Sequence, residues 1–262
     1  TVIVTGGTYG LGRGISLTLA RRGWSVLAFG LESRQVSSEA ENAIPGLTEE
    51  AKAGGLDLDA VEADVSSEAD IARVVERGLS RHGRIDALVN NAAIGPLGTV
   101  LDTDPDLWDA IMSVNLRGPY LAARAVLPHM IAQGGGSIVN VGSGAGWGKP
   151  NMAAYSTSKG GLVALSAALA LDHFSDRIRV NTIIPGGGGI VGGMSLGRVG
   201  GDYEKLRSTA VGTAAGRYTT GEDLGNTVAF LLSDEAEVIS GTIIDVGCFA
   251  HQGSSTPLKR PQ

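Results

Sequence analysis

The chain contains 262 residues, of which 43 % are hydrophobic and 18 % are charged, and its 40 glycines follow no three-residue period. These values exclude a disordered chain and a collagen-like fibre, and the length suits one large α/β domain. The net charge of −6 includes no block of like charges, so we expect no nucleic-acid partner. The single cysteine, Cys248, excludes an internal disulfide and is typical of a cytoplasmic protein.

Apolar runs rich in β-branched residues alternate along the chain with segments of helical period, and none reads as a membrane span. The expected strands are 1–5, 24–29, 56–63, 85–90, 136–142, 177–184 and 242–247. The expected helices lie near 11–22, 37–54, 67–82, 106–132, 152–174 and 221–232. This alternation predicts the α/β fold class, as a single doubly wound Rossmann-type domain with a mainly parallel seven-stranded sheet and helices on both faces. A ligand crevice is expected beyond the carboxyl ends of the strands.

The first expected strand runs into a glycine-rich turn, TGGTYGLG over 5–12, which opens the first expected helix. Backbone amides without bulky side chains over them, together with the helix dipole, can hold a pyrophosphate at such a turn. A tight strand-helix turn without a ligand is the alternative interpretation. The cofactor contacts expected here are Gly6, Thr8, Tyr9, Gly10, Leu11 and Gly12.

Further motifs follow in chain order. They are Asp64-Val65, Asn90-Asn91-Ala92-Ala93, Asn115, Ser143, and Tyr155 with Lys159 in a Tyr-x-x-x-Lys pair. Together with the spacing Thr-Gly-x-x-x-Gly-x-Gly, and with Tyr155 twelve residues after Ser143, they resemble the short-chain dehydrogenase/reductase family over most of the chain. The resemblance implies cofactor contacts at Asp64, Val65, Asn91 and Ala92, and a catalytic set of Asn115, Ser143, Tyr155 and Lys159.

The residue types in this set suit acid/base chemistry on their own. Tyr155 and Lys159 are four residues apart on an expected helix, so both project from one face. A nearby ammonium stabilises the phenolate of a tyrosine, whose ordinary pKa of about 10 makes it a poor base at neutral pH. Ser143, at a strand end, could hydrogen-bond a carbonyl oxygen as charge develops there. The resemblance implies that Asn115 relays protons or positions water, and that Lys159 also holds the nicotinamide ribose.

The sequence thus predicts an NAD(P)-dependent oxidoreductase that interconverts a secondary alcohol and a ketone, acting on a small-molecule alcohol or ketone by hydride transfer. One alternative is a non-catalytic protein that senses dinucleotides on the same fold. A second alternative is an epimerase or dehydratase of the family's longer branch. No metal site is expected, because the four histidines show no metal-binding spacing.

The cofactor preference depends on the end of the second strand. Gly30 stands where NAD-preferring relatives carry an acidic residue, which favours NADP, although neither Leu31 nor Tyr9 supplies the cation usual in NADP-preferring relatives. Glu32 could reach a ribose hydroxyl, whereas Ser33, Arg34 and Arg13 could reach a 2′-phosphate. The sequence therefore favours NADP slightly, with Gly30 and Arg34 as cofactor contacts.

The last third of the chain holds a glycine-rich segment over 186–216, with eleven glycines in thirty-one residues, which we expect to form a substrate flap. Pro185, Gly186 and Ile190 at its start are expected cofactor contacts. Residues 1–248 are expected to form the dinucleotide-binding catalytic domain, and 249–262 a C-terminal tail. The resemblance also implies a homo-oligomer, a tetramer or dimer, which the alanine-rich stretch 153–170 could support.

Overall fold

The computed structural model describes residues 1–32, 42–186, 194, 200, 202, 204–205 and 213–247. The strands in this part of the chain are β1 (Val2–Thr5), β2 (Val26–Gly30), β3 (Leu58–Glu62), β4 (Ala87–Asn90), β5 (Gly136–Val141), β6 (Ile178–Pro185) and β7 (Ile243–Val246). The helices are α1 (Gly10–Arg21), α2 (Ala43–Ala53), α3 (Glu68–His82), α4 (Pro105–Met112), α5 (Gly118–Ala132), α6 (Ala153–Asp172) and α9 (Gly221–Leu232). Three short helical turns complete these elements: η1 (Ser113–Arg117), η2 (Gly144–Trp147) and η3 (Asp234–Ala236).

The strands form one sheet in the order β3-β2-β1-β4-β5-β6-β7, and the six strand pairs of the described chain are all parallel. The order reverses beside β1, because the chain moves outward to β3 and then returns to the other side of β1 with β4. In an open parallel sheet this reversal leaves a crevice at the carboxyl ends of the strands. The expected fold class is confirmed.

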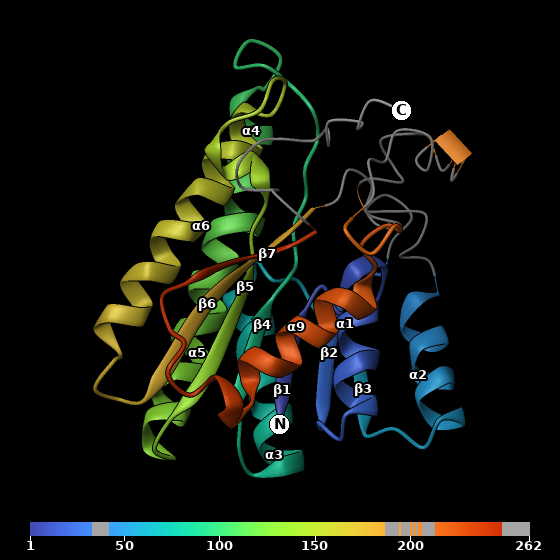
Figure 1. Cartoon of the computed structure of the whole chain (residues 1–262), viewed down its shortest axis with the longest axis vertical. Coiled ribbons are helices and arrows are strands. Elements are labelled where there is room, and N and C mark those ends of the chain that lie inside the picture. Colours follow the sequence, from blue (N-terminus) through green and yellow to red (C-terminus); the bar gives the residue numbers. More distant parts are fainter. Residues whose placement is uncertain are drawn as a thin grey trace.

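Alternating side chains along each strand supply two apolar layers, one on each face of the sheet. Val2 and Val4 pack with α1, α2 and α9 on one face, whereas Ile3 packs with α3, α5 and α6 on the other. Figure 1 shows α1 and α9 in front of the sheet, with α5 and α6 on the opposite side of the molecule from α2. Burial on both faces explains why the strands read as nearly continuous apolar runs in the sequence.

One expected helix differs from the structure. The segment 106–132 was predicted as a single helix, but it consists of α4, a π-helical turn at η1, and α5. A π turn adds one residue to the helical period, and such turns occur frequently at functional sites. Here the turn contains Asn115, one of the expected catalytic residues.

Several expectations fall outside the described residues. They are the first part of the expected helix near 37–54, most of the expected flap over 186–216, Arg34, Ile190, Cys248 and the tail 249–262. The other strand ends lie within about two residues of their predicted positions, as expected for boundaries predicted from patterns alone.

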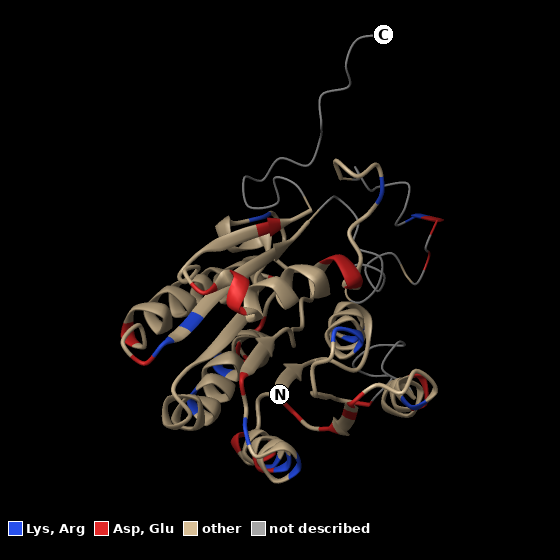
Figure 2. Cartoon of the chain, turned by 60° about the horizontal axis from the view of Figure 1, so that its bottom comes forward, with Lys and Arg blue, Asp and Glu red and all other residues tan. Residues whose placement is uncertain are grey.

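Figure 2 shows acidic and basic residues interspersed along the helices and loops of the chain. Ion pairs tie α3 to β3 and to the residue before it, with Arg77 bonded to Asp59 at 2.5 Å and Arg81 bonded to Asp57 at 2.9 Å. In the described part of the chain no helix has the length and apolar character needed to span a membrane.

Candidate active site

The glycine-rich turn after β1 leaves backbone amides exposed at the start of α1. Tyr9 takes the N-cap position, and its side chain makes no capping hydrogen bond to this helix. Two positions of this turn require glycine because other backbone atoms lie close to them. A Cβ at Gly6 would lie 2.8 Å from Ala92 Cα, and one at Gly12 would collide with the Gly6 carbonyl oxygen. Open amides at a helix N-terminus fit an anionic pyrophosphate.

Asn91 holds this turn against the end of β4. Its Nδ2 donates to the carbonyl oxygens of Gly6 at 2.9 Å and Thr5 at 3.2 Å. Thr5 Oγ1 in turn accepts from the backbone N–H groups of Asn91 and Ala92, both at 3.0 Å. The residues after two neighbouring strands are therefore locked together at the point where the strand order reverses.

A hollow beside the turn lies where the adenosine half of a dinucleotide is expected. Its walls come from the ends of β1, β2, β3 and β4. The lining includes six of the expected cofactor contacts: Gly6, Tyr9, Gly30, Asp64, Val65 and Ala92. Asp64 is held in place because its Oδ1 accepts from the backbone N–H and hydroxyl of Ser66 at 2.8 and 2.7 Å. Leu31 and Phe29 add apolar surface for a ring to lie on.

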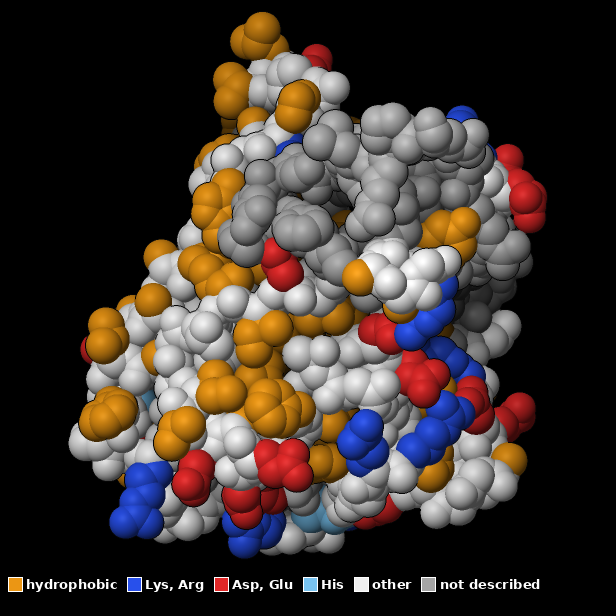
Figure 3. Space-filling view, in the orientation of Figure 1, with side chains coloured by type: hydrophobic (Ala, Val, Ile, Leu, Met, Phe, Trp, Pro, Cys, Tyr) orange, Lys and Arg blue, Asp and Glu red, His pale blue; other side chains and the backbone are white. Residues whose placement is uncertain are grey.

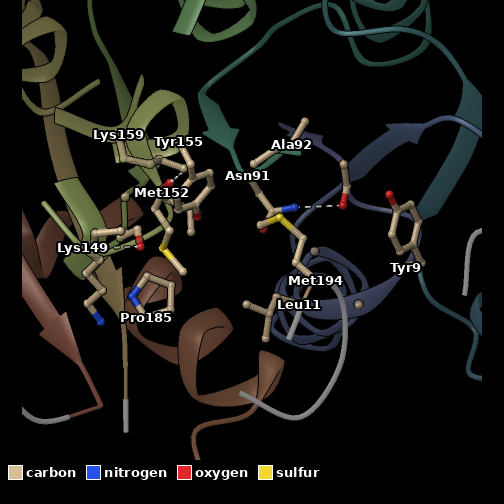
Figure 4. A pocket seen from close by; sticks show the side chains of 18 residues that line it. Tyr9, Leu11, Asn91, Ala92, Lys149, Met152, Tyr155, Lys159, Pro185 and Met194 are labelled. Atoms are coloured by element: carbon tan, nitrogen blue, oxygen red, sulfur yellow. Dashed lines mark hydrogen bonds between the residues drawn. The ribbon is translucent and has the colours of Figure 1, made fainter. Parts of the chain in front are cut away.

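A second hollow joins the glycine-rich turn to the ends of β5 and β6. Its lining includes Leu11, Ser143, Tyr155, Lys159 and Pro185. Figure 4 shows Tyr155 and Lys159 together on one side of this hollow, Asn91 and Ala92 in its middle, and Tyr9 at the far side. The structure therefore brings an acid/base pair to the opposite end of the cleft from the adenosine hollow.

Lys159 is a buried titratable residue of this cleft whose pKa departs from its ordinary value. Only 2 % of the residue is exposed, and its Nζ donates to the Val141 carbonyl oxygen at 2.8 Å. Burial lowers the pKa of Lys159 from 10.5 to about 8, because a charged ammonium loses hydration there. The Nζ lies 5.9 Å from the centre of the Tyr155 ring, one helical turn earlier on α6. A perturbed cation beside a tyrosine in a cleft is typical of a catalytic site.

Ser143 lies two residues after the end of β5 and takes the N-cap position of the following turn η2. Its Oγ accepts from the backbone N–H of Ala145 at 3.2 Å. An oxygen that accepts this bond keeps its hydroxyl proton available for a second partner. Because Ser143 lines the same hollow as Tyr155, that partner can be the oxygen of a bound substrate.

Asn115 is fully buried in the π turn η1 and lines neither hollow. Its Oδ1 accepts from the Ile94 N–H at 2.8 Å, and its Nδ2 donates to the Ile94 carbonyl at 2.8 Å and to Ser158 Oγ at 3.1 Å. Ser158 then donates to the Tyr155 carbonyl oxygen at 2.7 Å. Asn115 therefore links the loop after β4 to the helix that carries Tyr155.

Two other expected cofactor contacts lie outside the two hollows. Thr8 is wholly buried beneath the turn, and Gly186 donates its N–H to the Val246 carbonyl at 2.9 Å. The sequence does not point to the Val141 carbonyl that bonds Lys159, because every strand residue has such a carbonyl. It also does not point to Lys149, Met152 and Met194, which line the second hollow. Of these, Met152 could have been found, because it precedes Tyr155 by three residues.

No group of three or more His, Cys, Asp or Glu residues in the described chain could hold a metal ion. The fold and the cleft together define an α/β protein that binds a dinucleotide at the strand-order reversal and presents an acid/base pair to a second molecule. Comparison with known proteins agrees with this class.

Residues 6–248 match the family described as enoyl-(acyl carrier protein) reductase. A 2-(S)-hydroxypropyl-CoM dehydrogenase of Xanthobacter autotrophicus is 35 % identical and covers 98 % of this chain and 96 % of its own length. The 3-oxoacyl-[acyl-carrier-protein] reductase FabG of Thermotoga maritima is 31 % identical, over 93 % of this chain and 94 % of its own.

A solved structure from Burkholderia xenovorans, described as a short-chain dehydrogenase/reductase, superposes with a TM-score of 0.82 at 28 % identity. It covers 97 % of this chain and 96 % of its own. The chain belongs to the short-chain dehydrogenase/reductase family and is an NAD(P)-dependent oxidoreductase. The predicted class, an oxidoreductase, is confirmed, because these relatives are named as dehydrogenases and reductases. The relatives' names do not favour the two alternatives, a dinucleotide sensor and an epimerase or dehydratase.

Proposed function

We propose that the enzyme interconverts a secondary alcohol and a ketone at the end of the cleft where Ser143, Tyr155 and Lys159 meet. The observation that carries this proposal is the buried Lys159 ammonium beside the Tyr155 ring, in the same hollow as Ser143. A bound nicotinamide dinucleotide supplies or accepts the hydride, which is chemistry that no side chain offers. The side chains supply orientation, charge stabilisation and the proton.

Tyr155 acts as the general acid in ketone reduction and as the general base in alcohol oxidation. The Lys159 ammonium stabilises its phenolate, and the low dielectric of the buried site strengthens this attraction. One N–H of Lys159 goes to the Val141 carbonyl, which leaves two for the hydroxyls of a ribose. Ser143 donates to the substrate oxygen as negative charge develops on it.

Asn115 is a positioning residue in this proposal. Its two bonds to Ile94 and its bond to Ser158 set the distance between the loop after β4 and the first turn of α6. Since Tyr155 lies on that turn, its ring position depends on this contact. Asn115 accordingly acts on the reaction through Tyr155 rather than by touching the substrate.

The cofactor residues follow from the same geometry. The open amides at the start of α1 hold the pyrophosphate, and Asp64 and Val65 flank the adenine. Thr8 supports the turn from beneath. Gly186, Arg34 and Ile190 complete the proposed cofactor contacts. The choice between NAD and NADP depends on the charges around the adenosine ribose.

Replacement of Tyr155 by Phe tests the proposal, with Tyr218→Phe, at a partly exposed tyrosine that lines neither hollow, as the matched control. A panel of ketones is assayed with NADH and NADPH, beginning with 3-oxoacyl and 2-oxopropyl compounds, which the names of the relatives suggest. We expect Tyr155→Phe to lower kcat by about 10²–10⁴-fold, the usual effect of removing a general acid. Dinucleotide binding should stay within a few-fold in both variants. Unchanged turnover in Tyr155→Phe would contradict the role given to Tyr155.

The broader organisation is proposed on the same basis. Residues 1–248 form the catalytic domain, with the glycine-rich segment as substrate flap and 249–262 as a tail, in a cytoplasmic enzyme. An apolar groove on α4, α5 and α6 is lined by Met112, Leu116, Tyr120, Gly161 and Leu165, with Asp109 and Arg117 at its edges. A second copy of the chain, related by a two-fold axis, would cover this groove, so we propose a homo-oligomer.

A further inference from the structure

The segment between β5 and α6 brings a cation to the second hollow, the one that Ser143 and Tyr155 line. Lys149 is part of the same lining and is an exposed residue. Figure 4 shows Lys149 on the side of the hollow that carries Tyr155, away from Tyr9 and the glycine-rich turn. The Lys149 ammonium is therefore on the side proposed for the substrate, and not on the side proposed for the pyrophosphate.

The backbone around Lys149 is held at both ends of its segment. Before it, the Gly148 N–H donates to the Ala145 carbonyl oxygen at 2.8 Å, at the end of η2. After it, the Asn151 carbonyl oxygen accepts from the Gly98 N–H at 2.8 Å, which ties the segment to the loop after β4. The place of Lys149 relative to the first turn of α6 is thus set by the fold, and only its side chain is left to rotate.

The charged side chains that line this hollow have one sign. Among its described lining residues they are Lys149 and Lys159, and none is acidic. Lys159 is buried and donates to the Val141 carbonyl oxygen beside the Tyr155 ring. Lys149 is exposed, and no carboxylate of the described chain is paired with it. A cation that no acid neutralises, at the edge of a cleft, attracts an anionic ligand.

Apolar side chains line the same hollow, namely Ala145, Met152, Pro185 and Met194. Apolar walls lower the local dielectric, which strengthens the attraction between an ammonium at the edge and an anion that enters. Methionine side chains adapt readily to apolar groups of different shape. The hollow therefore suits a compact ketone that has an apolar body and an anionic end.

We propose that Lys149 selects ketones and secondary alcohols that carry an oxyanion, such as a carboxylate or a sulfonate. Its ammonium donates a charge-assisted hydrogen bond to this anion while the reacting oxygen lies at Ser143 and Tyr155. Holding the substrate at two points orients the carbonyl for hydride transfer. This assignment rests on the proposed function and specifies the substrate class of that site.

The experiment compares 4-oxopentanoate with its neutral methyl ester, and uses 3-oxobutane-1-sulfonate as a second anion. The proteins are wild type, Lys149→Met, Lys149→Arg and Lys52→Met. Lys52→Met is the matched control, because Lys52 is an exposed residue of α2 that lines neither hollow and loses the same charge. Calorimetry measures binding of each compound to enzyme saturated with the oxidised dinucleotide, which cannot reduce a ketone. Absorbance of the reduced dinucleotide gives kcat/KM.

We expect wild type to favour each anion over the ester at least tenfold, in Kd and in kcat/KM. Lys149→Met should lower this preference about tenfold, through loss of the charge-assisted hydrogen bond. Lys149→Arg should keep most of it, and Lys52→Met should keep it within twofold. Added salt should weaken the preference in wild type, because the Lys149 ammonium is exposed.

Binding of the anions by wild type that is no tighter than binding of the ester overturns the role of Lys149, as does an unchanged preference in Lys149→Met. Dinucleotide affinity is measured in the same proteins by fluorescence titration. Weaker dinucleotide binding by Lys149→Met also overturns the proposal, because Lys149 would then hold a cofactor phosphate. Failure of wild type to bind any nicotinamide dinucleotide overturns the proposed function instead, so the two failures are distinguishable.

Discussion

Lys159 shows how a single residue can be costly to the fold and useful to the reaction. Its ammonium is buried and bonded to one backbone carbonyl, that of Val141, and its pKa falls to about 8. An ordinary lysine in the unfolded chain has a pKa near 10.5. Between these two values the unfolded state binds more protons than the folded state, so the free energy of unfolding rises with pH in that window.

Replacing Lys159 by Met should therefore change how stability depends on pH. Relative to Lys159→Met, the wild-type protein without cofactor should gain roughly 3 kcal/mol in its free energy of unfolding between pH 8 and pH 10.5. Below pH 8 the difference between the two proteins should be constant. Urea unfolding at several pH values checks this, and parallel stability curves from pH 7 to 10 would show that Lys159 is not desolvated.

At the scale of elements, the contact between α1 and α9 depends on two glycines. A Cβ on Gly14 would lie 2.6 Å from Gly221 Cα and 2.7 Å from its carbonyl carbon, and backbone atoms cannot turn aside as a side chain can. Gly78 within α3 is different, because a Cβ there would meet Leu27 Cδ2 at 3.6 Å, an ordinary contact distance. Gly14 therefore permits the close approach of two helices, whereas the site of Gly78 has room for a side chain.

The same substitution should have opposite effects at these two positions. Gly14→Ala should lower the free energy of unfolding by about 1–3 kcal/mol, because the helices must separate. Gly78→Ala should raise it by up to about 1 kcal/mol, because alanine favours the helix and loses less entropy on folding. Thermal and urea unfolding of both variants measure the sign, and a stabilising Gly14→Ala would contradict the close approach of α1 and α9.

At the scale of the whole molecule, apolar surface is left uncovered on and beside α6. Figure 3 shows hydrophobic side chains along the edge that α6 forms, and Leu171 and Phe174 at its end are each 78 % exposed. The groove between α4, α5 and α6 adds Leu165 and Tyr120. Exposed large apolar side chains of this kind are typical of a subunit interface.

A charge placed in the groove should separate the proposed subunits. Light scattering at micromolar concentration should give wild type a mass of two or four chains, and Leu165→Glu a smaller mass, because an unpaired carboxylate is unfavourable in an apolar interface. Ile131→Glu, at an exposed position of α5 outside the groove, is the control and should keep the wild-type mass. A wild-type monomer would end the proposal.

Local patterns were enough to predict most of the elements and the proposed catalytic residues. Strand composition and helical period placed the seven strands within about two residues, and the Tyr-x-x-x-Lys spacing placed Tyr155 and Lys159 on one helix face. The break at η1 was not predictable, because a π turn adds a single residue and leaves the apolar period nearly unchanged. Thr8, which the sequence predicts as a cofactor contact, is wholly buried beside Gly30 at the end of β2, a neighbour that the local pattern does not give.

By itself the sequence determined the parallel sheet, the order of the motifs and the family, because these depend on composition, period and spacing within short segments. Only the tertiary structure decided which groups meet: the Val141 carbonyl with the Lys159 ammonium, Asn115 with Ile94, and Arg13 with Glu50. These contacts join elements far apart in the chain, and burial and pairing of charge depend on such neighbours. The pairing of Arg13 on α1 with Glu50 on α2, for example, is specified by no single segment of the sequence.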